Sequence, residues 1–183
     1  MPCTRTGIPL VGPSPPVKAT LGGHRMGSRM EPITGRANIT LDPMTVAPVT
    51  PTDAYLGAAE GLLPGAQVLA ASTESAMALT LVCGHIAECL LKALLAKAGI
   101  AEKELAGRAL RHDLRGLWQR AVATGCPVGA AEPTWLKRLS ALHNAPFHLR
   151  YPVGLNGLVL PGAEPMVSDL KQLAEVVRRA VRA

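Results

Sequence analysis

A short segment in the C-terminal third of the chain gathers side chains that could act on a phosphodiester. Residues 138–152 include two Arg, two His, an Asn and a Tyr. An imidazole can accept and return a proton near neutral pH, and a guanidinium can hold a phosphate. The segment is therefore a candidate for phosphodiester chemistry without a metal. The alternative is structural, with His143 and Arg150 fastening a helix end to its neighbours.

A second group of cationic side chains, Arg108, Arg111, His112 and Arg115, precedes and enters an expected helix. Arg111 and Arg115 would lie one turn apart at its N-terminus. Guanidinium groups together with free backbone N–H groups suit phosphate binding there. A solvated basic face is the competing interpretation.

A third group, His85, Glu88 and Lys92, interrupts an apolar helical stretch. Spacings of three and four put the three side chains on one face, and Glu88 precedes Lys92 in the favourable order for an ion pair. We expect a structural polar seam, with ligand contact as the alternative. The His residues do not have metal-ligand spacing with Cys or acidic residues, so we predict no metal and no cofactor.

The element that must position these groups is residues 74–98, the longest uninterrupted helical signal in the sequence. It is apolar nearly all round, which predicts the central helix of a bundle. Glu88 and Lys92 fall within it, and the uncharged run over 75–84 is too short to span a membrane. We therefore expect no membrane partner.

Shorter helical signals surround this element. Thr50-Pro51 should begin a helix to about Ala71, which the Pro64-Gly65 pair should kink or break. Asp113 should begin another, ending near Thr124. Further helices are expected from Pro133 to before Pro146 and from Pro165 to the C-terminus, and Asn156-Gly157 suggests a tight turn that could close a short hairpin. The expected fold class is all-α, an up-down bundle of four to five helices.

Composition separates the chain into two parts. Residues 1–49 contain eight of the sixteen Pro and no helical period, which predicts a disordered tail before a bundle over 50–183. The net charge of +6 permits a polyanionic partner without requiring one. The absence of paired CxxC motifs and of an apolar leader favours a cytoplasmic protein with free thiols.

Three segments in this order resemble the HEPN family, the higher eukaryote and prokaryote nucleotide-binding helical bundles. They are GHIAECLLKALLAKAG at 84–99, RHDLRGLWQRA at 111–121 and LHNAPFHLRYP at 142–152. The resemblance covers about residues 50–183. It implies a helical bundle, commonly a homodimer, that works beside a nucleotidyltransferase or an antitoxin.

The resemblance also implies two possible functions. One branch of the family consists of metal-independent ribonucleases with an Arg and, four to six residues later, a His, a spacing that Arg138 and His143 match. Leu139 and Ala145 depart from that branch, and the Arg-Tyr-Pro ending is similar to the branch that lacks nuclease residues. We therefore expect a module that binds nucleotide or RNA, with an endoribonuclease toxin as the alternative and a purely structural dimer as a third possibility. The expected ligand-binding residues are Arg111, His112, Arg115, His148, Arg150 and Tyr151.

Overall fold

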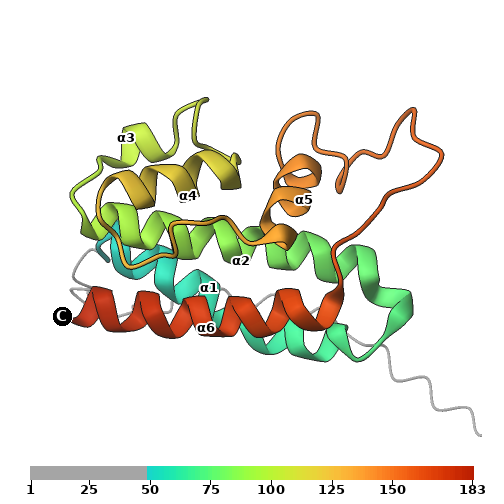
Figure 1. Ribbon diagram of the computed structural model, residues 1–183, viewed down its shortest axis with the longest axis horizontal. Helices are drawn as coiled ribbons and strands as arrows, with labels where there is room; N and C mark the ends of the chain where they lie inside the picture. Colours follow the sequence, from blue (N-terminus) through green and yellow to red (C-terminus); the bar gives the residue numbers. More distant parts are fainter. Residues whose placement is uncertain (1–48) are drawn as a thin grey trace, which may run out of the picture. The chain divides into compact units, whose positions relative to one another are not determined.

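The computed structural model describes residues 49–183, so the tail predicted over 1–49 lies, apart from Val49, outside the described residues. Within residues 49–183 the regular structure is helical and contains no strand, which confirms the all-α class (Figure 1). The hairpin considered near Asn156-Gly157 is wrong, because the segment between the last two helices is irregular. The helices are α1 (Pro51–Ala70), the 3₁₀ turn η1 (Thr73–Ser75), α2 (Ala76–Lys97), α3 (Glu102–Leu105), α4 (Leu114–Ala123), α5 (Thr134–His143) and α6 (Ala163–Arg182).

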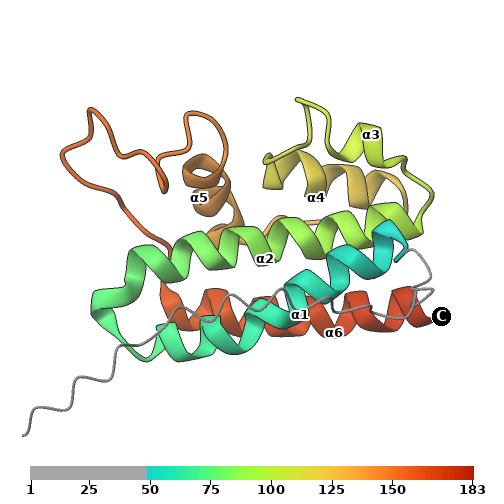
Figure 2. The same cartoon turned by 180° about the vertical axis from the view of Figure 1, so that it is seen from behind.

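Helix α2 is the centre of the described fold, as its apolar sequence predicts. It contacts α1 and α6 along one side and α4 and α5 along the other (Figures 1 and 2). Its residues from Ile86 to Leu95 are all buried. The stretch Thr73–Lys97 is long and apolar enough to cross a membrane, but 78% of its most apolar window is buried inside the protein. Burial by neighbouring helices is what the core helix of a soluble bundle requires.

Helix α1 begins where the sequence predicts and continues further than Pro64 suggests. The Thr50 side chain accepts a hydrogen bond from the Asp53 backbone N–H at 3.1 Å, and Pro51 occupies the first turn. Pro64 lies inside the helix, which continues to Ala70. Of the two effects predicted for Pro64-Gly65, a break is wrong, whereas a kink stays a prediction, and the helix ends near Ala71 as expected. Leu63 and Ala66 on either side of the proline are buried in the core, and their packing outweighs the lost hydrogen bond.

A side-chain relay fixes the start of α4 against α5. Asp113 precedes α4 as expected, but its carboxylate does not cap the helix directly. The backbone N–H of Arg115 instead donates to the Ser140 hydroxyl at 3.3 Å, and that hydroxyl donates to Asp113 at 3.2 Å. Ser140 is buried on α5, so this relay holds the residues before α4 beside the last turn of α5.

Candidate functional site

The four side chains of Glu88, Lys92, His112 and His143 form a polar cluster inside the apolar core, the Glu88 cluster. The Glu88 carboxylate is 5% exposed. Its Oε1 accepts a hydrogen bond from Lys92 Nζ at 2.7 Å, which confirms the predicted ion pair. Its Oε2 lies 3.0 Å from His112 Nδ1 and 2.9 Å from His143 Nε2. One carboxylate therefore joins α2, the segment before α4 and the end of α5.

Each partner is brought to Glu88 by a different feature of the fold. Lys92 follows Glu88 by one helical turn, and its ammonium also donates to the Arg111 backbone carbonyl at 3.0 Å. That contact fixes the residue next to His112. His143 is the last residue of α5, and its ring lies directly against Gly84 of α2. A side chain at position 84 would occupy the space of that ring, so glycine permits the close approach.

The hydrogen bonds keep the Glu88 carboxylate ionised. Burial by itself raises the pKa of this carboxyl, but hydrogen bonds from His143, Lys92 and His112 outweigh burial and lower the pKa from 4.5 to about 2. Since a carboxylate only accepts, His112 and His143 direct N–H groups at it. This assigns the proton of His112 to Nδ1 and that of His143 to Nε2. The charge of Glu88 is balanced by Lys92 within the core.

Glu88, His112 and His143 also offer three metal-ligand atoms within 4.8 Å of one another. A His₂Glu set suits zinc by ligand type. The surroundings do not suit a resident cation, however, because the Lys92 ammonium lies 2.7 Å from the same carboxylate and already supplies its counter-charge. We therefore assign the Glu88 cluster to holding the fold and not to metal binding.

His85, the third residue of the predicted seam, does not join this cluster. Its side chain is exposed, and its Nε2 lies 3.8 Å from Cys89 Sγ. The seam is therefore made by Glu88 and Lys92, and its further members come from other helices.

A pocket of about 430 Å³ opens beside the Glu88 cluster, and we call it the His112 pocket. His112 belongs to both, since its side chain is 17% exposed while its Nδ1 contacts Glu88. The Phe147 ring packs edge-on against the His112 ring at a centroid distance of 5.4 Å, and the Arg150 guanidinium lies 5.8 Å from the Phe147 centroid. The lining residues are Ala106, Arg108, Arg111, His112, Asn144, Ala145 and Phe147.

The charges around this pocket suit an anionic aromatic ligand. Arg108 and Arg111 are exposed, and among the described residues their guanidinium groups form no ion pair. Guanidinium groups bind phosphate through paired N–H donors, and the Phe147 ring offers a surface for stacking. Asn144 adds an amide N–H₂ group, whereas its Oδ1 already accepts a hydrogen bond from the Ala145 backbone N–H at 2.8 Å.

The other predicted site residues are distributed more widely. Arg115 does not line the His112 pocket, and its Nε pairs with Glu132 at 2.9 Å. Arg138 is exposed on α5 and lines pockets on the side of the irregular segment after α5, whereas His143 is buried, so the two do not share a pocket. Their five-residue spacing on a helix separates their directions by about 140°. His148 lies with Arg138, while Arg150 and Tyr151 are exposed.

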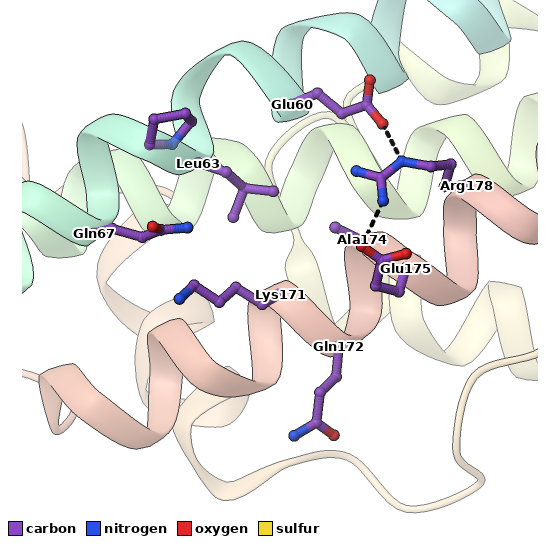
Figure 3. A pocket seen from close by; sticks show the side chains of 9 residues that line it. Glu60, Leu63, Gln67, Lys171, Gln172, Ala174, Glu175 and Arg178 are labelled. Carbon is purple, nitrogen blue, oxygen red and sulfur yellow. Dashed lines mark hydrogen bonds and ion pairs between the residues drawn. The ribbon is translucent and has the colours of Figure 1, made fainter.

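A further pocket of about 520 Å³ lies between α1 and α6 (Figure 3). Its charged groups are largely satisfied by one another: Arg178 pairs with Glu60 at 2.7 Å and also with Glu175. The Arg178–Glu60 pair joins α6 to α1, whereas the Arg178–Glu175 pair lies within α6. Lys171 lines the groove without an ion pair among the described residues, but the groove also carries two carboxylates, so it suits an anion less than the His112 pocket does.

Two features of the site escaped the sequence analysis. The first is the contact of both His112 and His143 with Glu88. The two histidines lie 24 and 55 residues from Glu88 in the sequence. The signal was a carboxylate in an otherwise apolar helix, since a buried charge needs partners from outside its own helix. The second is Phe147, which lines the His112 pocket. It lies in a turn, so no helical period in the sequence indicates where its side chain lies. Comparison with protein-family models, with curated proteins and with solved structures gives no match to this chain.

Proposed function

We propose that the chain is a HEPN-like helical module that binds the phosphate groups of a nucleotide or of RNA in the His112 pocket. The observation that carries the proposal is the presence of Arg108, Arg111 and Phe147 around one pocket of about 430 Å³. Ligand pockets of this class usually measure about 300–1,000 Å³. The order of the three HEPN-like segments supports the same function.

The Glu88 cluster gives the pocket a defined chemical wall. Because Glu88 receives the Nδ1 proton of His112, Nε2 is the acceptor nitrogen of the neutral imidazole. Within residues 49–183, the side-chain nitrogens that are enclosed without a partner are Nδ1 of His143 and Nδ1 of His148. Nε2 of His112 is not one of them. It can therefore accept a hydrogen bond from a ribose hydroxyl or a base amino group. Phosphate would bind to the two arginines.

The endoribonuclease alternative requires His143 to exchange protons with bound RNA. His143 is 2% exposed, its Nε2 is bonded to Glu88, and its Nδ1 faces Gly84. Proton transfer would require the end of α5 to open. This environment favours the binding module over catalysis by Arg138 and His143. We further propose a cytoplasmic homodimer that works with a nucleotidyltransferase or an antitoxin, on the strength of the sequence resemblance.

The test is fluorescence anisotropy with a labelled single-stranded RNA and a fluorescent ATP analogue, repeated over a series of salt concentrations. Arg111→Gln should weaken binding about tenfold, because a charge-assisted hydrogen bond contributes about 1.5–3 kcal/mol. It should also reduce the dependence of affinity on salt by about one phosphate contact. The matched control is Arg179→Gln, which removes the same charge from an exposed position on α6.

Equal losses in the Arg111 and Arg179 variants would indicate nonspecific attraction and would contradict the assigned pocket. No binding of either probe at millimolar protein would refute the function itself. RNA cleavage should be measured in parallel with EDTA present. Robust cleavage that Arg138→Gln abolishes, in a variant with unchanged circular dichroism, would establish the endoribonuclease in place of the binding module.

A further inference from the structure

A second pocket, which we call the Arg138 pocket, lies between α5 and the irregular segment that follows it. Its volume is about 490 Å³. Adjacent residues of the turn after α5 serve the two pockets: Phe147 lines the His112 pocket, whereas His148 lines the Arg138 pocket. The backbone of Phe147 has a φ of 63°, which helps to turn the two side chains to different sides. The Arg138 pocket is therefore separate from the proposed phosphate site.

Arg138 gives this pocket an uncompensated positive charge. It is exposed, and within residues 49–183 its guanidinium forms neither an ion pair nor a hydrogen bond. Asp169 lines a neighbouring pocket with Arg138 but forms no ion pair with it, and its carboxylate accepts a hydrogen bond from Trp135 at 2.8 Å. A guanidinium with all its donors available at a pocket wall can bind a carboxylate through two parallel hydrogen bonds.

His148 supplies a second polar group to the pocket wall. Its Nδ1 is enclosed without a hydrogen-bond partner among the described residues, so a ligand in the pocket cannot reach that atom. Nε2, the other ring nitrogen, also has no partner among these residues and is not enclosed. With its proton on Nε2, the imidazole can donate a hydrogen bond to an anionic ligand group in the pocket.

The remaining wall of the pocket is apolar and partly uncovered. Leu142 and Leu158 line it from α5 and from the irregular segment, together with Leu155 and Val159. Leu155 is 39% exposed and Val159 is 78% exposed. A ligand for this pocket must therefore combine an anionic end for Arg138 with apolar surface for these side chains.

We propose that the Arg138 pocket binds an organic anion with an apolar tail, of the medium-chain carboxylate class. The carboxylate pairs with Arg138 and accepts a hydrogen bond from His148 Nε2, and the tail covers Leu155, Leu158 and Val159. This site does not depend on the function proposed for the His112 pocket. An inorganic anion alone would leave the apolar wall uncovered, and a neutral apolar molecule would leave Arg138 and His148 unpaired.

The test is isothermal titration calorimetry of the full chain with octanoate and two matched ligands. Butyrate keeps the carboxylate and shortens the tail, and octylammonium keeps the tail and reverses the charge. Octanoate should bind with a Kd below about 1 mM, and both matched ligands should bind at least about tenfold more weakly. Arg138→Gln should weaken octanoate binding about tenfold through the lost charge-assisted hydrogen bonds.

Three further variants keep the result interpretable. Lys137→Gln removes the neighbouring positive charge on α5, outside the pocket, and should leave octanoate affinity within about twofold. Val159→Asp changes an exposed residue of the wall, so it should weaken octanoate without affecting the melting temperature. Arg111→Gln should leave octanoate affinity unchanged, which separates this site from the His112 pocket.

The proposal is overturned if octanoate does not bind at millimolar concentration or if octylammonium binds equally well. Equal affinity of the wild type and Arg138→Gln would also overturn it. A loss of octanoate binding in Arg111→Gln would assign the anion to the His112 pocket and contradict a separate site.

Discussion

Replacing Gly84 by alanine should disturb the Glu88 cluster although none of its four residues is substituted. A Cβ at position 84 would lie 2.6 Å from His143 Nδ1 and 3.1 Å from His143 Cγ. Gly84 is buried in α2, and His143 is 2% exposed, so the ring cannot yield into solvent without leaving its place. The substitution must either displace the imidazole from Glu88 or compress the contact between α2 and α5.

The magnitude follows from these two outcomes. Displacing the ring removes a hydrogen bond to a charged acceptor, which costs about 1.5–3 kcal/mol. Keeping the ring in place overpacks the core, which costs about 1–3 kcal/mol. Alanine recovers about 1 kcal/mol of helix propensity relative to glycine. The net destabilisation of Gly84→Ala should therefore be about 0.5–2 kcal/mol if the ring is displaced and about 0–2 kcal/mol if it stays in place.

The assay is urea denaturation followed by circular dichroism, with Gly57→Ala as the matched control. Gly57 is also inside a helix, but nothing lies within 4 Å of a Cβ added there. Gly57→Ala should therefore stabilise the protein by about 0.4–1 kcal/mol. The two identical substitutions should have opposite signs. If Gly84→Ala is as stabilising as Gly57→Ala, the close packing of His143 on α2 is refuted.

Three other measurements address the core. Because the folded-state pKa of Glu88 is about 2, below its ordinary 4.5, its stabilising contribution of about 3 kcal/mol is complete above pH 4.5 and is lost as the pH falls towards 2. Urea denaturation from pH 6 to 3 should show this loss, and a flat profile would contradict it. Glu88→Gln should remove that pH dependence and destabilise the protein by about 3–5 kcal/mol, because Lys92 stays buried without its counter-charge; a loss below about 1 kcal/mol would contradict this. Burial raises the thiol pKa of Cys83 to about 12 and that of Cys89 to about 11, so iodoacetamide should modify both only after unfolding, as mapped by peptide mass spectrometry; labelling of either in the native protein would count against their burial.

The helices could be predicted from the sequence because their signals are local. Apolar coverage predicted a central helix over 74–98, and α2 occupies Ala76–Lys97. The Thr50-Pro51 pair marked the start of α1, and Asp113 marked the residue before α4. Each of these signals depends on neighbours within one or two turns, which a single sequence displays directly.

The errors in the fold arose where long-range packing opposed a local preference. Pro64-Gly65 predicted a kink or a break, and the break is wrong because the buried residues on both sides keep α1 continuous. Asn156-Gly157 suggested a hairpin, but an isolated two-stranded hairpin has little stability of its own, and the described fold offers it no sheet. In both cases the deciding contacts come from other parts of the chain.

The site was predictable only in its components. The spacing of Arg111 and Arg115 predicts a shared phosphate site, but only Arg111 lines the pocket, together with His112, whereas Arg115 pairs with Glu132. The hydrogen bonds from His112 and His143 to Glu88 could not be predicted, because they join residues on three separate helices or their ends. Pairing Arg138 with His143 from spacing alone also failed to indicate that one is exposed and the other buried.

The single carboxylate of Glu88 has a consequence for how a ligand would meet the His112 pocket. The wall formed by residues 106–112 is fixed to Glu88 through His112 and through the contact of Lys92 with the Arg111 carbonyl. The wall formed by residues 144–147 comes directly after His143 in the chain, and His143 also bonds to Glu88. Both walls are thus preorganised when the chain folds, and little further ordering entropy opposes association. Without that carboxylate, Arg108 and Arg111 would remain on one wall and Phe147 on the other, but the two walls would move independently. Affinity would then fall although no ligand-contacting group had been removed.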